Sequence, residues 1–223
     1  MALNKAEGIT LFSSSLKEKS RIIRVYTLER GLLSFVTNYI SRKNSAMISF
    51  CSPCTYSEII YMDKDRDLLN VKEITIKNLY LPLRDSFEKL EAAICIAKST
   101  LTSQQENKPN STLFNLIERF LTKISNAQNP LAYACSFQLK LLILEGLFDL
   151  SFKCSICNSS AKIISRGECF CSKHSYDGIT FEEGELKKLF QLSTAKKFSD
   201  IDKAQVEKSL KQKIQGLFLQ IFN

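Results

Sequence analysis

The fold is decided first by a β-hairpin, which is read from the stretch Ile22-Ile23-Arg24-Val25-Tyr26-Thr27-Leu28-Glu29-Arg30-Gly31-Leu32-Leu33. Residues 21–28 and 32–40 are rich in β-branched and aromatic side chains, which favour strands. Between them lies the polar linker Glu29-Arg30-Gly31, whose glycine can adopt the positive φ that a tight turn requires. The stretch therefore predicts two antiparallel strands joined by a short turn.

Similar runs lie on both sides of this hairpin. Patterns typical of strands occur at residues 9–16, 46–52, 57–62 and 71–78, and the charged run 63–67 supplies a solvated turn. Five or so short strands in the first 80 residues predict a small β-barrel.

The periodicity changes to that of helices after Leu81-Pro82-Leu83-Arg84, which breaks the strand series. Asp85 followed by Glu88 resembles a capping box and predicts a helix start. Apolar residues then recur at helical spacing in two helices separated by a loop at residues 107–110, and a third helix follows Pro130. Helical periodicity resumes at residues 186–192 and 206–218. The chain is thus predicted to have an α+β fold, a β-barrel followed by an all-helical domain.

The clearest chemical signal is a group of four cysteines and the chain's one histidine within 21 residues. Cys154-Ser155-Ile156-Cys157 places two thiols at the spacing that lets one tight turn hold a tetrahedral zinc ion. Cys171 and His174 have the same spacing and offer the second pair, and Cys169 is an alternative to Cys171. The pattern predicts a structural zinc knuckle inserted between helices. A catalytic zinc is disfavoured, because Glu168 is the one acidic neighbour inside the motif.

A second C-x2-C motif, Cys51-Ser52-Pro53-Cys54, has no partner pair nearby in the sequence. It falls in a predicted strand region, whereas redox motifs of this spacing lie at a strand-to-helix turn. Packing in the core or in a turn is therefore expected for both thiols.

A basic cluster covers the predicted hairpin. Its seven members share a 27-residue segment with only two acids: Lys17, Lys19, Arg21, Arg24, Arg30, Arg42 and Lys43. On a small barrel such residues can form a cationic groove for a phosphate backbone, and Tyr26, Phe35 and Tyr39 could stack on bases. The alternative is a solvated strand face with its aromatic residues in the core. The lysines Lys187, Lys188, Lys196 and Lys197, taken alone, are more typical of a solvated helix face.

The net charge of +8 is concentrated at the two ends of the chain. Residues 1–80 and 151–223 each carry 12 basic and 8 acidic side chains, and residues 81–150 carry 7 of each, so the ends are the expected surfaces for a polyanion. No phosphate-binding loop, dinucleotide fingerprint, nucleophile elbow or H-E-x-x-H motif is present, which argues against an enzyme. The start of the chain lacks a signal-peptide pattern and no apolar run is long enough to span a bilayer, so a cytoplasmic protein is expected. If its basic ends bind DNA, we expect it to be nucleoid-associated.

Two stretches resemble the RecO family of recombination mediators. Residues 22–33, quoted above, are similar to the family's second strand, turn and third strand. Gly146-Leu147, followed by Cys154-x-x-Cys157, Gly167 and Cys171-x-x-His174, is similar to its helix end and zinc knuckle. The order of modules also resembles the family along the whole chain. Two departures are His174, where the family commonly has cysteine, and Asn38-Tyr39-Ile40-Ser41, where it often has a basic turn.

The resemblance implies an oligonucleotide-binding (OB) barrel that binds single- and double-stranded DNA and anneals complementary strands. It implies four parts: a barrel (residues 1–80), a helical domain (81–150), a zinc-binding insertion (151–178) and C-terminal helices that complete the helical domain (179–223). The implied partners are a RecR-type ring protein, the acidic tail of single-strand-binding protein, and indirectly a RecA-type recombinase. Lys187 and Lys188 would suit that acidic tail. The competing hypothesis is a zinc-stabilised adaptor that binds other proteins but not DNA.

Overall fold

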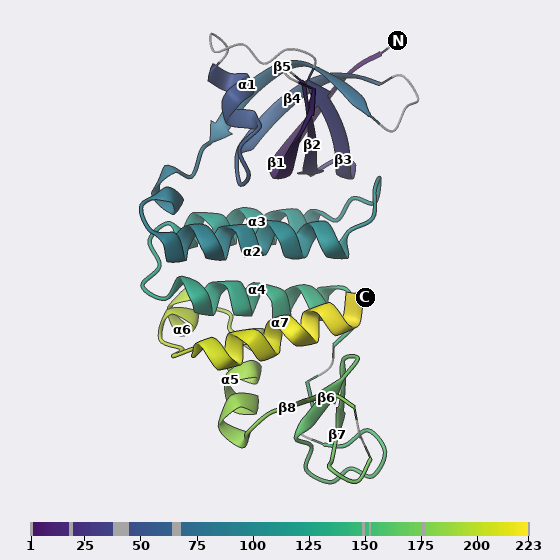
Figure 1. Cartoon of the computed structure of the whole chain (residues 1–223), viewed down its shortest axis with the longest axis vertical. Helices are drawn as coiled ribbons and strands as arrows, with labels where there is room; N and C mark the ends of the chain where they lie inside the picture. The colour runs from purple at the N-terminus through teal and green to yellow at the C-terminus, as the bar shows by residue number, and fades with distance from the viewer. Residues whose placement is uncertain are drawn as a thin grey trace. The chain divides into compact units, whose positions relative to one another are not determined.

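The computed structural model describes residues 2–17, 20–37, 45–63, 68–148, 150–151, 153–174 and 177–222. These residues form two compact units, Met1–Asn126 and Ala127–Asn223. The first unit contains a barrel and two long helices, and the second contains four helices and a small sheet (Figure 1).

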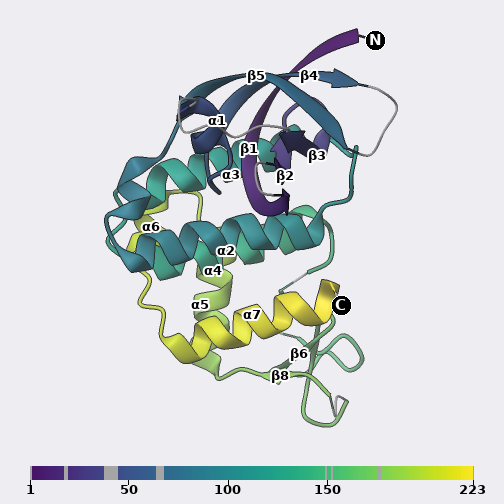
Figure 2. The ribbon, with the colours of Figure 1, turned by 45° about the horizontal axis from the view of Figure 1, so that its top comes forward.

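Five strands close into a barrel in the order β1-β2-β3-β5-β4 (Figures 1 and 2). Their bounds are β1 (Ala2–Lys17), β2 (Ser20–Thr27), β3 (Gly31–Thr37), β4 (Tyr56–Asp63) and β5 (Leu69–Asn78). The long strand β1 pairs with both β2 and β4, and parallel pairing of Phe35 with Leu69 closes the ring. The predicted hairpin is confirmed, since Thr27 pairs with Gly31, which has φ +70°. The OB-like barrel followed by helices is also confirmed.

Residues 46–52 were expected to be a strand, and this prediction is wrong. They form helix α1 (Ser45–Phe50) and the turn after it. Met47, Phe50 and Cys51 belong to the barrel core, and Phe50 packs edge-to-face on Phe35 with ring centroids 6.3 Å apart. Their spacing of three and four residues is that of one helix face, but a short apolar run does not distinguish helix from strand by composition.

The first unit continues with the 3-10 turn η1 (Leu81–Arg84) and helices α2 (Phe87–Ser103) and α3 (Ser111–Ile124). Ser86, and not the expected Asp85, caps α2 by accepting a hydrogen bond from the Lys89 backbone N–H at 3.2 Å. Asn110 caps α3 in the same way. Helix α2 packs against α3 and against strand β1, so the helices cover one side of the barrel (Figure 2).

The second unit is built around α4 (Pro130–Leu144), which packs against α5 (Glu183–Thr194), α6 (Phe198–Asp202) and α7 (Lys208–Phe222). Two polar side chains of the buried helix α4 donate hydrogen bonds to backbone carbonyl groups at the C-terminal end of α5. Ser136 donates to the Leu192 carbonyl at 2.7 Å, and the Lys140 ammonium donates to the Ser193 and Ala195 carbonyls at 3.0 and 2.8 Å. Within the described part of the chain, no helix has both the length and the apolar character needed to cross a membrane.

Candidate metal centre and nucleic-acid interface

The predicted zinc ligands lie on two turns attached to a three-stranded sheet, ordered β7-β6-β8, in the second unit (Figure 1). The strands are β6 (Ile163–Ser165), β7 (Glu168–Phe170) and β8 (Ile179–Thr180). The first turn, after Cys154, is closed by the Asn158 N–H donating to the Cys154 carbonyl at 2.9 Å. The second turn is closed by the His174 N–H donating to the Cys171 carbonyl at 3.1 Å. The Ser155 N–H donates to the Cys169 carbonyl at 2.9 Å and thereby joins the first turn to strand β7.

The donor atoms of Cys154, Cys157, Cys171 and His174 all lie within 4.8 Å of one another. His174 Nδ1 is 3.5 Å from both the Cys154 and the Cys171 sulfur, and the Cys157 and Cys171 sulfurs are 3.8 Å apart. A tetrahedral zinc with sulfur ligands at about 2.3 Å and nitrogen at about 2.0 Å sets sulfurs about 3.8 Å apart and sulfur and nitrogen about 3.5 Å apart. The four side chains therefore fit a tetrahedral metal ion.

The charges in this cluster also suit a cation. Burial opposes ionisation of Cys154, but hydrogen bonds from the backbone N–H groups of Cys171, Cys157 and Ile156 outweigh it and lower the pKa of Cys154 to about 5. The pKa of Cys171 is lowered as well, chiefly by the Ser159 hydroxyl. The thiolate of Cys154 in turn raises the pKa of His174. Thiolates are the form of cysteine that binds metal, so the site is already arranged for a divalent cation.

The structure brings Cys171, and not its alternative Cys169, into the cluster. Cys169 lies within β7, opposite Ile164 of β6, and is buried. The β6–β7 turn consists of Arg166 and Gly167, both at positive φ, as the tightest hairpin turns require. Gly167 also meets a close backbone neighbour, because an added Cβ would lie 2.0 Å from the Leu147 carbonyl oxygen. This explains why a glycine precedes the second ligand pair.

The second C-x2-C motif is packed as expected. Cys51 and Cys54 are both buried in the turn that follows α1. Burial raises the pKa of Cys54 to about 12, which keeps this thiol protonated. All eight cysteines lie in the described residues and none forms a disulfide.

The basic residues of the hairpin do not share one face of strand β2. Arg21 lies on the same side as the core residues Ile23 and Val25, and it donates to the Ser13 hydroxyl at 3.4 Å. Arg24 is three residues away and faces outward, because side chains alternate along a strand. Lys19, Arg42 and Lys43 fall outside the described residues, as does the side chain of Lys17.

Arg24 and Arg30 each contact the loop that joins α2 to α3. The Arg24 guanidinium lies 3.2 Å from the Glu106 carboxylate, and Arg30 donates to the Asn107 side-chain carbonyl at 3.0 Å. Both contacts lie within the first unit. Of the arginines predicted to bind a phosphate backbone, two are therefore engaged by this loop.

Two of the three aromatic residues proposed to stack on bases are buried. Phe35 belongs to the barrel core, and Tyr26 is covered where its hydroxyl lies 3.5 Å from Gln104 and from the Asn110 carbonyl. For both residues the structure favours the alternative expectation, that they are packed inside, and Tyr39 lies outside the described residues.

Sequence reasoning missed an exposed aromatic residue beside Arg24, Phe12. It is 47% exposed and lies directly opposite Arg24, which in turn lies opposite Ser34 of β3. Directly paired residues project from the same face of a sheet, so Phe12, Arg24 and Ser34 form one row across three strands. We call these three residues the outer row. A β-bulge between Thr10 and Phe12 shifts the register of β1, which a strict alternation along the sequence does not reveal.

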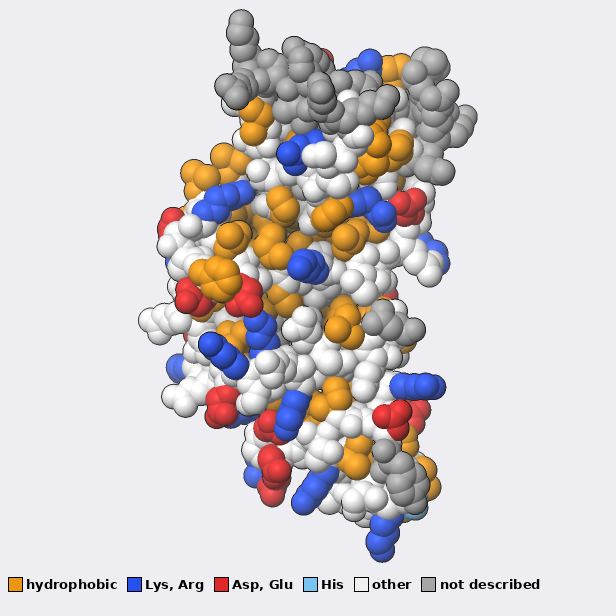
Figure 3. All heavy atoms as spheres, in the orientation of Figure 1, with side chains coloured by type: hydrophobic (Ala, Val, Ile, Leu, Met, Phe, Trp, Pro, Cys, Tyr) orange, Lys and Arg blue, Asp and Glu red, His pale blue; other side chains and the backbone are white. Residues whose placement is uncertain are grey.

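Two lysines of the barrel strands, Lys5 and Lys77, are neutralised locally. Lys5 and Lys77 lie 3.0 and 3.4 Å from the Glu58 carboxylate, and Lys77 lies 3.6 Å from Glu7. The face drawn in Figure 3 likewise shows Lys and Arg side chains scattered among hydrophobic and acidic ones. No continuous cationic groove is therefore visible among the described residues on the face drawn in Figure 3. The outer row is distinguished instead by an aromatic ring paired with an arginine.

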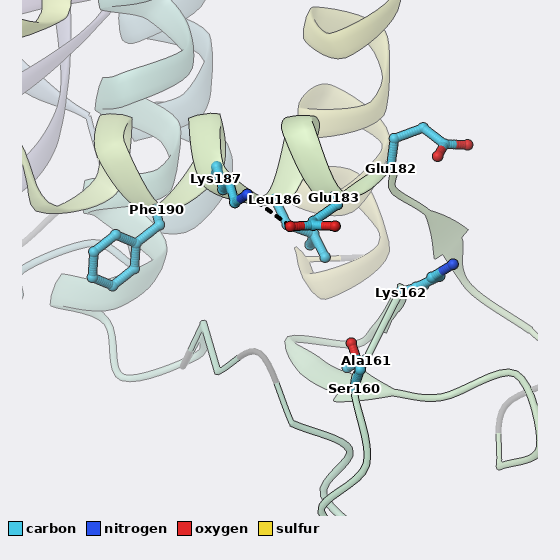
Figure 4. Close-up of a pocket in the computed structure, with 8 residues that line it drawn as sticks. All are labelled: Ser160, Ala161, Lys162, Glu182, Glu183, Leu186, Lys187 and Phe190. Carbon is cyan, nitrogen blue, oxygen red and sulfur yellow. Dashed lines mark ion pairs between the residues drawn. The ribbon is translucent and has the colours of Figure 1, made fainter.

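A pocket of about 540 Å³ lies in the second unit, between the chain entering β6 and helix α5 (Figure 4). Its lining is partly apolar and partly charged: Ser160, Ala161, Lys162, Glu182, Glu183, Leu186, Lys187 and Phe190. Lys187 is paired with Glu183 at 2.7 Å, as the dashed line in Figure 4 marks. Lys188 is not among the lining residues, whereas Lys162 is a basic residue of the pocket that the sequence did not single out.

Comparisons with known proteins agree with this arrangement. The family model described as recombination protein O N terminal matches residues 1–80, and the one described as recombination protein O C terminal matches residues 84–222. The protein named DNA repair protein RecO from Chlamydia pneumoniae is 33% identical, over 87% of this chain and 78% of that protein. Proteins of the same name from Chlamydia muridarum and Streptococcus pyogenes are 29% and 22% identical, over 87% and 100% of this chain and 85% and 90% of those proteins. The chain therefore belongs to the RecO family, whose members act in DNA repair and recombination.

Proposed function

We propose that this protein is a recombination mediator that binds single- and double-stranded DNA through its barrel and anneals complementary strands. In doing so it helps replace single-strand-binding protein with a RecA-type recombinase, and a RecR-type ring protein is its partner. It has no catalytic role of its own. Family membership supports a role in repair, and the outer row is the observation that supports DNA contact. The other proposed members of the DNA surface are Lys17, Lys19, Arg21, Arg30, Arg42 and Lys43. Of these, Arg21 projects from the opposite side of β2 to Arg24.

The zinc proposed for the Cys154, Cys157, Cys171 and His174 cluster is structural. Four protein ligands fill a tetrahedral coordination sphere, and this leaves no open position for a substrate. The ion would hold residues 151–178 as a folded insertion. The other proposed parts of the chain are the barrel (residues 1–80), the helical domain (81–150) and the C-terminal helices (179–223). An adaptor that binds protein alone is the alternative, and salt-dependent binding of a random single strand separates the two functions.

Phe12→Ala is expected to weaken binding of a random single-stranded oligonucleotide roughly tenfold, because stacking of one base on an aromatic ring is worth about 1–3 kcal/mol. The slope of log affinity against log salt should not change, since no phosphate contact is lost. Fluorescence anisotropy across a salt series measures both. The matched control is Phe87→Ala, which removes a ring that is 75% exposed on α2 in the same unit. If the two substitutions weaken binding equally, the outer row does not contact DNA as proposed.

We also propose that the pocket beside α5 takes the acidic tail of single-strand-binding protein. Leu186 and Phe190 supply apolar surface, and Lys162 and Lys187 supply cations for a carboxylate-ended peptide. Lys187→Glu should then weaken binding of a tail peptide about tenfold or more, because it places a carboxylate beside Glu183 and the peptide's own carboxylates. Lys188→Glu has the same charge change but lies off the pocket, so it should have a much smaller effect. Calorimetric titration would contradict the assignment if the two variants bind alike.

A further inference from the structure

The loop between α2 and α3, residues 104–110, is docked on the outer surface of the β2–β3 hairpin. The Asn107 N–H donates to the Leu32 carbonyl at 3.1 Å, and Glu106 forms a parallel bridge with Leu32. The fit at the turn is close, because a Cβ on Gly31 would lie 2.2 Å from the Lys108 carbonyl oxygen. These contacts use the backbone, so they position the loop independently of its charges.

This docking places the Glu106 carboxylate against two of the three residues of the outer row, Arg24 and Ser34. Glu106 Oε1 lies 3.2 Å from the Arg24 guanidinium and accepts a hydrogen bond from the Ser34 hydroxyl at 3.0 Å. Arg24 itself lies directly opposite Phe12. A guanidinium binds carboxylate and phosphate oxyanions with the same geometry. Glu106 therefore occupies a position on the Arg24 guanidinium that a nucleic-acid phosphate would also take.

The ion pair between Arg24 and Glu106 is of a kind that another anion can displace. The two side chains are 32% and 41% exposed, and ion pairs with this degree of exposure are weak. Arg24 is also incompletely satisfied in this arrangement, since its Nε is buried without a hydrogen-bond acceptor among the described residues. The backbone contacts of the loop to β3 do not involve the carboxylate.

We propose that Glu106 is a built-in competitor of nucleic-acid phosphate for Arg24. This inference rests on the proposed function, in which the barrel binds DNA. When a strand binds, its phosphate takes the place of the Glu106 carboxylate at the Arg24 guanidinium, and no covalent bond is made or broken. Glu106 thereby lowers the affinity of the barrel for DNA and reduces its dependence on salt, because an arginine that already has an anion releases no counterion.

The test is Glu106→Gln, which removes the charge while its carbonyl oxygen can still accept from Ser34. Binding of a random single-stranded oligonucleotide by the full-length protein should tighten roughly fivefold, the loss of a pair worth about 1 kcal/mol. The salt slope should steepen by about 0.7, the contribution of one phosphate contact on a single strand. The matched control is Glu73→Gln, an exposed carboxylate on β5, which changes the net charge equally. The double variant Arg24→Gln with Glu106→Gln should show neither the tighter binding nor the steeper salt slope of Glu106→Gln.

Three results would overturn the proposal. If Glu106→Gln and Glu73→Gln bind alike while the wild type binds normally, Glu106 is no competitor and the proposed DNA binding stands. If the double variant binds as tightly as Glu106→Gln, Arg24 is not the group released. If the wild type and both single variants fail to bind any strand, the proposed function falls and the competitor role falls with it.

Discussion

Cys171→Ser is expected to abolish zinc binding and to unfold residues 151–178, while the barrel keeps its strands. The sheet that carries the ligands has two strands of three residues and one of two, and few of its side chains are buried. Such a segment lacks the hydrophobic core that would hold it folded without an ion. Apparent binding free energies of structural zinc are about 10–16 kcal/mol, and in small modules this energy is the energy of folding.

The matched control is Cys169→Ser, two residues away. Cys169 and Cys171 are similarly buried, at 3% and 7% exposure, but the Cys169 sulfur is not part of the ligand cluster. Metal analysis of the purified variants should give one zinc per chain for the wild type and for Cys169→Ser, and none for Cys171→Ser. Limited proteolysis should then cleave Cys171→Ser, and the chelated wild type, within residues 151–178. Retention of zinc by Cys171→Ser, or its loss from Cys169→Ser, would contradict this ligand set.

Features set by local spacing could be predicted from the sequence. Cys154-x-x-Cys157 and Cys171-x-x-His174 identify two turns that the structure brings together, and Gly31 marks the hairpin turn. In each case the chemistry needs particular residue types at a fixed short distance along the chain. Such constraints are visible without knowledge of the tertiary fold.

Features set by distant contacts could not be predicted. Tyr26 is buried where Gln104, 78 residues later, lies against it, and no local sequence pattern predicts that contact. Helix α1 was mistaken for a strand because its short apolar run fits either element until the barrel core is known. The opposite orientation of Arg21 and Arg24 is different, since the two-residue period of a strand already implies it. Treating the basic residues as one groove overlooked that period.

Changing Arg21, Arg24 and Arg42 together to Glu is expected to abolish strand annealing. Each change removes a cation from the proposed DNA surface and adds a repulsive carboxylate. Loss of three phosphate contacts alone should lower the affinity for DNA on the order of 100-fold at low salt. Arg24→Glu also places a carboxylate against Glu106, so the variant should be checked for native secondary structure by circular dichroism.

The control is a second triple variant in which Lys72, Lys98 and Lys123 are changed together to Glu, which alters the net charge of the first unit equally. These lysines are exposed residues of β5, α2 and α3 and lie away from the outer row in sequence. If bulk charge alone governs annealing, the two triple variants will lose activity equally. If the barrel surface beside β2 governs it, the lysine variant will retain most of the wild-type rate.

The most direct test of DNA mediation by the barrel is the rate at which complementary single strands anneal, measured across a salt series for the wild type and both triple variants. The expected result is fast annealing by the wild type that slows steeply as salt increases, with similar behaviour of the lysine variant and no acceleration by the arginine variant. Unchanged annealing by the folded arginine variant would remove the barrel from the mechanism.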